Sequence, residues 1–374
     1  MPSPEISILL LAIKSDHADS KYVSEAGLLV SSGGVDWDEL YRLAELHTVR
    51  PQLAKLISTI DTAGVPEGFL IKIGEAYKDT LHSQLNFAAE FLKIRGMLVS
   101  ERIEIVPFKG FWLGYDAYGN MADREGFDVD VFVSAGKLGR VKEIMMSAGY
   151  TVEPAFRNMS TDEVRQISQE YVFERINNGV SRFRIEFHWG ISPPGYGLGI
   201  SLEDLRSQVT QGRFEGNEIL FFTPTAHMLL LLFHHGGDDR FIRLKQVYDI
   251  SVMLKTHPDI DWQWVLRIAE KFGAGELVYT GVALASELTG ADVPAPLIEG
   301  ASKRKTRRLV SERIRLLLRS ADGYFGRGFP LRNFMFRMRT RDGLRLKLKI
   351  TLATLKALAG KMIRGSEKRE LPDA

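Results

Sequence analysis

Two aspartates stand two residues apart in the segment "FDVDVFV" (127–133). Apolar and acidic residues alternate there, which indicates a strand, and the two-residue period of a strand puts Asp128 and Asp130 on one face. Two carboxylates about 7 Å apart on a half-buried face repel each other unless a cation lies between them. A pair of divalent metal ions could meet this need, and the plainer interpretation is the solvated face of an edge strand.

Two neighbouring features favour the metal-binding interpretation. Lys109-Gly110 lies where an apolar segment typical of a strand (103–108) passes into a helical segment, a place that favours phosphate binding. Arg124 precedes Asp128 by four residues and could either neutralise a phosphate or pair with the aspartates. The segment therefore combines groups that could bind a metal ion with groups that could bind phosphate.

A third acid comes from a later strand. The segment "SRFRIEFHW" (181–189) alternates apolar and polar residues, so Glu186 and His188 share its polar face. Three acids on two strands can hold two metal ions. We expect His188 to hydrogen-bond to Glu186 and not to act as a base, because a bound metal ion can itself lower the pKa of an acceptor hydroxyl.

The hydrophobic pattern predicts an α+β fold that positions these groups. A small mixed sheet alternates with helices, helices precede it, and the pattern from residue 223 onward is helical. Asn177-Asn178-Gly179 separates two strand patterns and predicts a hairpin turn. The helices expected before and within the sheet region cover residues 36–59, 67–100, 110–119 and 136–150.

Four regions follow from this pattern. The Gly-, Phe- and Arg-rich stretch 321–334 predicts a linker, followed by a last basic helix at about 341–363. We expect an N-terminal helical region (1–100), a catalytic core (101–222), a helical substrate-side domain (223–320) and a basic C-terminal extension (321–374).

Composition excludes several classes of protein. Hydrophobic residues make up 45% and charged residues 26%, which is ordinary for a globular protein, and no apolar run approaches the ~20 residues that span a bilayer. The absence of cysteine excludes disulfides, thiolate metal sites and cysteine nucleophiles, and it fits a cytoplasmic protein.

The charge of the chain is divided unevenly. Residues 301–374 hold 21 Lys and Arg against 6 Asp and Glu, a net charge of +15, which leaves 28 against 41, or −13, for residues 1–300. Such a basic block indicates a surface for phosphates, nucleic acid or anionic lipid, or a face that folds back on the acidic body. Both alternatives stay open at this point.

The last helix has an apolar stripe that bears on this choice. At helical spacing its leucines can form one stripe, with cations among the residues on the other faces. A stripe of this kind is typical of a helix that lies on a membrane surface or binds a partner, and equally of one that docks on its own protein. The stripe consists of Leu344, Leu348, Leu352, Leu355 and Leu358.

Taken together, these residues resemble a known group of enzymes. Three features are similar to those of the largely uncharacterised nucleotidyltransferases of the DNA polymerase β superfamily. They are Lys-Gly at a strand-to-helix turn, an arginine before two aspartates that alternate with apolar residues, and a later acid two positions before His-Trp. That group is similar to the antibiotic nucleotidyltransferases and to nucleotidyltransferase toxins. The resemblance covers about residues 36–295.

The resemblance implies a role for each site residue. It implies that Asp128 and Asp130 ligate two Mg²⁺ ions, with Mn²⁺ as the alternative, and that Glu186 is the third ligand. Lys109 and Gly110 would face the triphosphate of the nucleotide, and Arg124 is the third residue expected at the nucleotide. The residues expected on the substrate side of the cleft are His188, His234, His235, Arg243 and Asp249.

The adjacent histidines deserve a separate interpretation, because "HHGGDDR" (234–240) could also suggest a zinc site. Neighbouring residues on a helix point about 100° apart, unlike the i, i+4 pair of a helical metal site. We therefore expect His234 and His235 to make polar contacts at a helix end.

Two functions from different classes remain as hypotheses. The first is a Mg²⁺-dependent transfer of a nucleoside monophosphate from an NTP, with ATP as the first choice, to an acceptor hydroxyl with release of pyrophosphate. The acceptor (a sugar, an antibiotic, a protein or a tRNA end) and the oligomeric state are left open. The second is a non-catalytic binding protein that holds RNA or an anionic membrane surface through residues 321–374. The three acids favour the enzyme, because a polyanion-binding module gains nothing from concentrated negative charge.

Overall fold

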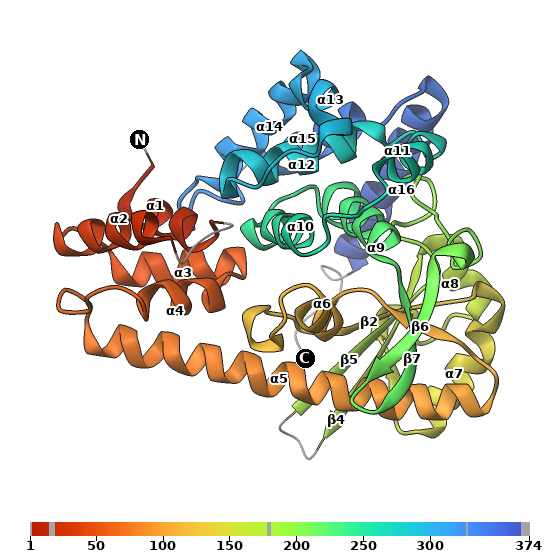
Figure 1. Cartoon of the computed structure of the whole chain (residues 1–374). Coiled ribbons are helices and arrows are strands. Elements are labelled where there is room, and N and C mark those ends of the chain that lie inside the picture. The colour runs from red at the N-terminus through yellow and green to blue at the C-terminus, as the bar shows by residue number, and fades with distance from the viewer. Residues whose placement is uncertain (1, 15–18, 178–180, 327, 368–374) are drawn as a thin grey trace.

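The structure, a computed structural model, describes residues 2–14, 19–177, 181–326 and 328–367. Its architecture is α+β, as the sequence predicts: a five-stranded mixed sheet is flanked by helices, and a helical second half packs beside it (Figure 1). The long helix α5 (Glu67–Ser100) runs along one side of the molecule, from the N-terminal helices to the sheet.

The N-terminal region is helical. The prediction of a helix over 67–100 is confirmed by α5, whereas the single helix predicted over 36–59 is wrong. That segment is broken at Thr48, whose φ of 53° is left-handed, and Pro51 lies in the first turn of the next helix, where its missing N–H costs nothing. The helices are α1 (Pro4–Ala12), α2 (Ser20–Ser31), α3 (Trp37–His47) and α4 (Arg50–Ile57).

The large sheet has the strand order β1-β2-β5-β4-β3. Its β2–β5 pair is parallel and the other pairs are antiparallel, which confirms a mixed sheet. The turn predicted between β4 and β5 lies largely outside the described residues. The strands are β1 (Ile105–Pro107), β2 (Val129–Val133), β3 (Thr151–Val152), β4 (Glu170–Asn177) and β5 (Ser181–His188), with a separate hairpin of β6 (Val209–Phe214) and β7 (Asn217–Phe222).

Short helices connect the strands. The connecting α-helices are α6 (Gly110–Asp116), α7 (Leu138–Ser147) and α8 (Thr161–Ile167). Single 3₁₀ turns occur at Met121–Asp123, Ala135–Lys137, Pro154–Phe156, Arg206–Gln208 and Ala295–Leu297. The strand predicted over 127–133 begins only at Val129, because pairing with β5 starts there.

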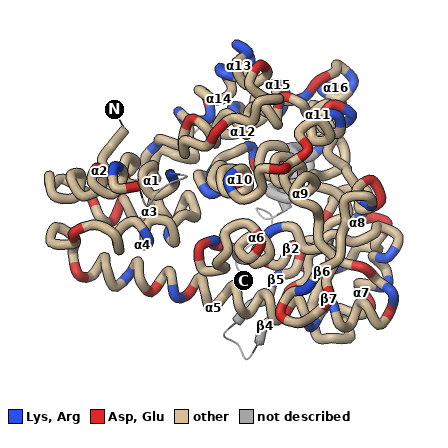
Figure 2. Tube along the Cα trace, viewed as in Figure 1, with Lys and Arg blue, Asp and Glu red and all other residues tan. Residues whose placement is uncertain are grey.

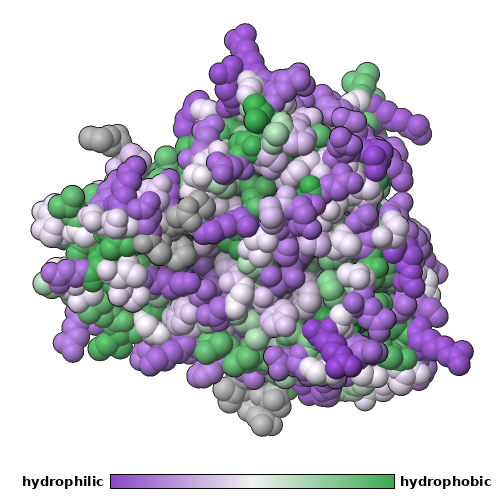
Figure 3. Space-filling model, in the orientation of Figure 1, coloured by the Kyte–Doolittle hydropathy of each residue, from purple (hydrophilic) through white to green (hydrophobic). Residues whose placement is uncertain are grey.

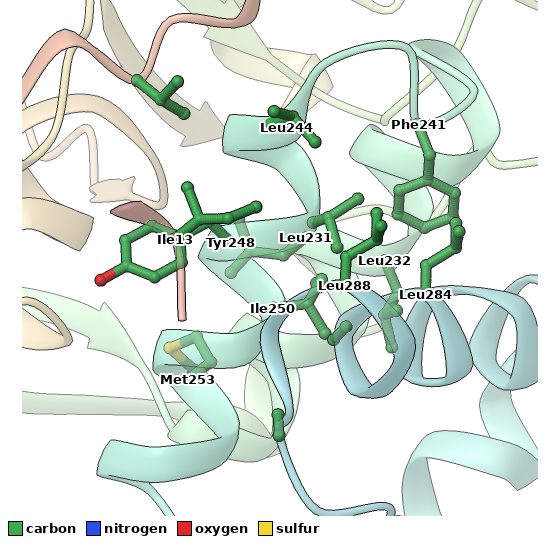
Figure 4. Close-up of a cluster of buried hydrophobic side chains, with 14 of the residues drawn as sticks. Ile13, Leu231, Leu232, Phe241, Leu244, Tyr248, Ile250, Met253, Leu284 and Leu288 are labelled. Carbon is green, nitrogen blue, oxygen red and sulfur yellow. The ribbon is translucent and has the colours of Figure 1, made fainter. Parts of the chain in front are cut away.

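The helical second half shares a core with the N-terminal helices. Ile13, which follows α1, lies beside Tyr248 and Leu231 in a buried apolar cluster (Figure 4). Lys14 Nζ also donates to the backbone oxygen of Leu288 at 3.0 Å. The four domain boundaries stay a prediction. The helices of this half are α9 (Pro224–Leu231), a π-helical segment η5 (Leu232–Asp238), α10 (Leu244–Thr256), α11 (Trp262–Lys271), α12 (Gly275–Thr289), α13 (Ile298–Ser302) and α14 (Arg304–Leu317).

The basic end of the chain is more ordered than the sequence predicts. The linker predicted over 321–334 is wrong from Phe329 onward, because α15 (Phe329–Arg339) begins there and buries Phe336. The last helix, predicted over 341–363, is α16 (Leu344–Glu367). Lys and Arg recur along α14 and α16 (Figure 2). On the face shown in Figure 3, hydrophobic residues form small groups between hydrophilic ones, as on ordinary globular surfaces.

Candidate active site

The parallel pairing of β2 with β5 brings two of the predicted acids together. Asp130 lies directly opposite Glu186 in the register, and both side chains are buried. Neighbouring strands are about 4.8 Å apart, and paired residues in register share one face of the sheet. The expectation that acids from two strands converge is therefore met by Asp130 and Glu186.

His188 completes this group. It lies two residues beyond Glu186, and its Nε2 is 3.0 Å from Asp130 Oδ1 and 3.5 Å from Glu186 Oε2. Burial alone would lower the pKa of His188, but hydrogen bonds to Asp130 and Glu186 raise it to about 10. The expected contact with Glu186 is present, and the contact with Asp130 is the shorter of the two.

Lys109 lies against the same carboxylates. Its Nζ is 2.9 Å from Asp130 Oδ1 and 2.8 Å from His234 Nε2, and the side chain is buried. Burial alone would lower the pKa of Lys109, but the negative charges of Asp130, Asp128 and Glu186 hold that pKa well above its usual range. The structure thus places Lys109 as a counterion of the carboxylates, and its contact with a triphosphate stays a prediction.

Gly110 allows the backbone to approach the aspartates closely. Its φ of 57° is left-handed, and a Cβ at this position would lie 2.9 Å from the backbone oxygen of Asp128. Any residue with a side chain would clash there, so the Lys-Gly turn is required by the geometry of the segment.

Asp128 differs from Asp130 in its environment. It precedes β2 and is half-buried, and burial together with Asp130 and Glu186 raises its pKa to about 7. Lys109 and His188 instead hold the pKa of the buried Asp130 below its usual range. The available cations therefore neutralise Asp130 more fully than Asp128, which is about half protonated at neutral pH.

These residues fit a divalent metal ion. Ligand atoms of Asp130, Glu186 and His188 lie within 4.8 Å of one another, and carboxylate oxygen is the ligand that Mg²⁺ and Mn²⁺ prefer. Asp128 is outside this set as the side chains stand, although its raised pKa shows that a further positive charge would be favourable beside it. The role of all three acids as metal ligands stays a prediction.

Arg124 does not pair with the two aspartates as one of its expected roles required. Its Nε and Nη2 each donate to Asp249 at 2.9 Å, and its Nη1 donates to the backbone oxygen of Gly110 at 3.2 Å. Asp249 also accepts from Tyr118 Oη at 2.6 Å and faces His235 Nε2 at 2.9 Å. A fork-shaped guanidinium matches a carboxylate with two parallel bonds, so Asp249 orients Arg124 beneath the Lys-Gly turn.

The two adjacent histidines lie in the π-helical segment, where an extra residue in the turn changes their directions. His234 Nδ1 is 3.1 Å and His235 Nδ1 is 3.7 Å from Asp239 Oδ2. These polar contacts agree with the expectation for a helix end. Ligand atoms of the three residues also lie close enough to hold a metal ion, which the sequence analysis disfavoured.

A cleft of about 280 Å³ joins these groups. Most of the predicted site residues line it, whereas Glu186, His188 and Asp249 lie outside its lining. The lining residues are Lys109, Gly110, Arg124, Gly126, Phe127, Asp128, Asp130, His234, His235, Asp239, Ile242, Arg243, Lys245 and Gln246.

Three residues of this region were missed by the sequence analysis. Lys245 lines the cleft and donates to the backbone oxygen of Glu125 at 2.9 Å, and burial and Arg124 lower its pKa to about 8. Glu170 faces His188 Nδ1 at 3.7 Å across the β4–β5 pair, and Asp239 faces the histidines. The i, i+4 spacing of Lys245 and Asp249 could have indicated Lys245, whereas no sequence signal marks Glu170.

Comparison with known proteins agrees with this geometry. The family described as uncharacterised nucleotidyltransferase matches residues 33–290. The chain belongs to this family. The match confirms the resemblance inferred over about 36–295, and it covers the sheet, the cleft and the helices that line it. No curated protein matches the chain.

The first prediction concerns the charge of Asp128. Its pKa is higher in the folded protein, about 7, than the ordinary value of 3.8, so ionisation costs stability as the pH rises through this range. In buffer with EDTA, Asp128→Asn should therefore raise Tm by about 2–4 °C at pH 8 and leave it nearly unchanged at pH 4. Thermal unfolding followed by circular dichroism measures this. Asp162→Asn, at an exposed position of α8, is the control, and a fall in Tm at pH 8 would contradict the assignment.

The second prediction concerns Lys245, which lines the cleft around Asp130. Its ammonium can attract a phosphate only while it is protonated, and its pKa is lowered to about 8. NTP affinity should therefore weaken as the pH rises through about 8. Lys245→Arg, whose charge persists at every pH in this range, should remove this dependence. Calorimetric titration of the wild type and of Lys245→Arg from pH 6.5 to 9.5 tests this, and identical pH profiles of the two proteins would exclude Lys245 from the phosphate site.

Proposed function

We propose that this protein transfers a nucleoside monophosphate from an NTP to an acceptor hydroxyl and releases pyrophosphate. The observation that supports this most is the convergence of Asp130 and Glu186, with Asp128 nearby, beside the Lys109-Gly110 turn, within a chain of a nucleotidyltransferase family. In this reaction the acceptor oxygen bonds to the α-phosphorus and the bond to the pyrophosphate oxygen breaks. The hydroxyl proton passes to water or to a site carboxylate.

Mg²⁺, as two ions or with Mn²⁺ in its place, would be held by Asp128, Asp130 and Glu186 and would neutralise phosphate charge and lower the pKa of the acceptor hydroxyl. His188 holds one oxygen of Asp130, and Arg184 Nε donates to Glu186 Oε1 at 2.9 Å. These contacts fix the directions of both carboxylates; they are made to Oδ1 of Asp130, whereas Glu186 is contacted at both oxygens, with His188 Nε2 3.5 Å from Oε2. Such orientation by neighbouring groups is what a metal-binding carboxylate requires.

Lys109 can change partners within this proposal. Its ammonium neutralises Asp130 in the structure, and a cation bound by the carboxylates would take over that role. The freed ammonium lies at the Lys-Gly turn, within the cleft that also contains Arg243 and Lys245. The chain would then present three cations to the triphosphate, in agreement with the role predicted for Lys109. His234 and His235 border the same cleft, where we place the acceptor.

The third prediction tests the reaction and its type. Asp130→Asn should abolish transfer, because it removes a carboxylate that contacts both Lys109 and His188. Asp162→Asn should keep full activity. In the assay, the protein and a cell extract are incubated with Mg²⁺ and each NTP in turn, beginning with ATP. Each NTP is labelled on either the α- or the γ-phosphate. Label from the α-phosphate alone should enter the acceptor.

Other results of this assay have definite meanings. Transfer of label from the γ-phosphate would identify phosphoryl transfer and overturn the proposal. Activity of Asp130→Asn equal to wild type would remove these carboxylates from the mechanism. Absence of label from every NTP, with intact RNA or vesicle binding, would favour the non-catalytic alternative.

We also infer that α16 holds the protein against an anionic membrane surface. The helix docks through one face: Ile350 is fully buried, and the side chain of Leu346 lies against Gly197. The opposite face carries the predicted leucine stripe, in which Leu344 is 75%, Leu348 56%, Leu352 59% and Leu355 57% exposed. Docking on the body thus uses other residues than the stripe, and the side chain of Leu358 lies outside the described part.

Charge supports a lipid surface as the partner of this face. Arg345 and Lys349 flank the stripe, Lys347 and Lys356 are further cations, and residues 344–366 contain no acid. RNA would attract the cations but leave the leucines without a partner, whereas anionic lipid satisfies both. None of the described helices is long and apolar enough to cross a membrane. We therefore propose a cytoplasmic enzyme that is peripheral at a membrane.

The fourth prediction tests this surface. Wild-type protein should sediment with vesicles of phosphatidylserine and phosphatidylcholine, less at high salt, and the double variant Leu348→Glu, Leu352→Glu should stay in solution. Leu85→Glu, at an exposed leucine of α5, is the matched control and should sediment like wild type. If light scattering shows a wild-type dimer that the double variant dissociates, the stripe covers a second copy of the chain and the membrane proposal is wrong.

A further inference from the structure

A second cleft, separate from the carboxylate site, lies between α14 and α15. It encloses about 370 Å³ and shares no lining residue with the cleft around Asp130. Its lining is strongly basic, with five arginines against one acid, and it has an apolar part. The polar residues are Arg313, Arg315, Arg319, Arg332, Arg339 and Glu312, and the apolar ones are Leu316, Leu331 and Met335.

The single acid of this cleft is already paired. Arg339 Nη1 donates to both oxygens of Glu312, at 2.6 and 2.7 Å, and Arg308 Nε donates to one of them at 3.1 Å. None of the other four arginines of the cleft forms an ion pair with an acid of the described chain. Four guanidinium groups therefore line one cleft without a carboxylate to balance them.

Two of these arginines also have buried N–H groups without acceptors. Arg313 is 2% exposed; its Nη1 donates to Asn333 Oδ1 at 3.0 Å and to the backbone oxygen of Arg240 at 3.3 Å, but its Nε has no partner. Arg332 has no partner for Nε or Nη2 within the described residues. Burial, together with Arg240 and Arg332, lowers the pKa of Arg313 to about 10.

Such an arrangement is unfavourable without an anion. A buried charge costs free energy unless it is paired, and each buried N–H without an acceptor adds to that cost. A phosphate offers several acceptor oxygens and at least one negative charge, and guanidinium groups bind it with paired hydrogen bonds. One such ligand could satisfy Arg313 and Arg332 together and reduce their repulsion.

We propose that the cleft between α14 and α15 binds a small soluble ligand that carries two or more phosphate charges. The volume lies in the range of small-molecule sites and is too small for folded nucleic acid. The arginines would hold the phosphates, and Leu316, Leu331 and Met335 offer apolar contact to the rest of the ligand. This site is additional to the nucleotide cleft and does not depend on the proposed reaction.

The fifth prediction tests this site with tripolyphosphate as the probe. Isothermal titration on the full chain, without divalent metal, should show binding that the double variant Arg315→Gln, Arg332→Gln weakens at least tenfold. Arg304→Gln, Arg307→Gln removes the same charge from exposed positions of α14 outside the cleft and should keep wild-type affinity. Inorganic phosphate, with fewer charges, should bind more weakly than tripolyphosphate.

A folding control accompanies the titration. Because Arg332 has no acid partner among the described residues, its replacement should leave Tm unchanged or higher without ligand. Tripolyphosphate should raise Tm of the wild type but not of the cleft variant.

Equal loss of affinity in both double variants would mean attraction by net charge alone. Loss only in Lys245→Gln would place the probe in the nucleotide cleft. Binding of RNA or phosphatidic acid vesicles that needs Arg315 and Arg332, with no binding of tripolyphosphate, would show that the ligand class is wrong. Each of these three results overturns the proposal.

Discussion

The repulsion among buried carboxylates on β2 and β5 is the constraint on which the rest of the site depends. Parallel pairing fixes Asp130 opposite Glu186, and a strand cannot move one of them away without changing the register of the sheet. Two buried cations, Lys109 and His188, both contact Asp130 and offset part of this repulsion. Asp128 remains poorly neutralised. An arrangement of this kind is costly for stability alone, which is why it indicates a site for a further cation.

A second buried ion pair ties this site to the helical half of the chain. Arg124 precedes β2, and Asp249 belongs to α10, so their fork-shaped contact joins two parts that are 125 residues apart in sequence. The carboxylate of Asp249 also accepts a hydrogen bond from Tyr118 and contacts His235. Because Arg124, Asp249 and His235 are buried, removal of one would leave the others with unsatisfied charge or hydrogen bonds. The pair thereby fixes how the Lys-Gly turn faces the histidines.

The sequence was sufficient for the local features of the site and insufficient for its partners. Strand periodicity identified Asp128, Asp130 and Glu186, because alternation is a local property. It did not reveal that Arg124 pairs with Asp249 or that Lys245 enters the cleft, since both depend on how α10 packs against the sheet.

The same limit applies to the fold. The helix over 67–100 was predicted to its ends, whereas the break at Thr48 depends on one left-handed residue. The linker assigned to 321–334 failed at Phe329, because its Gly-, Phe- and Arg-rich composition does not reveal that α15 begins there and packs Phe336 against Arg313 of α14. The outward direction of the leucine stripe on α16 likewise required the structure, since periodicity defines a face but not what that face meets.

The segment that follows the π-helical turn links the two clefts physically. Asp239 faces both histidines of the carboxylate cleft, and the backbone oxygen of the next residue, Arg240, accepts from Arg313 of the arginine cleft. Arg240 and Phe241 have φ values of 64° and 50°, a conformation that residues with side chains adopt only when their surroundings hold it. Since strained backbone persists only while its contacts do, the hydrogen bond from Arg313 helps to hold the segment that contains Asp239.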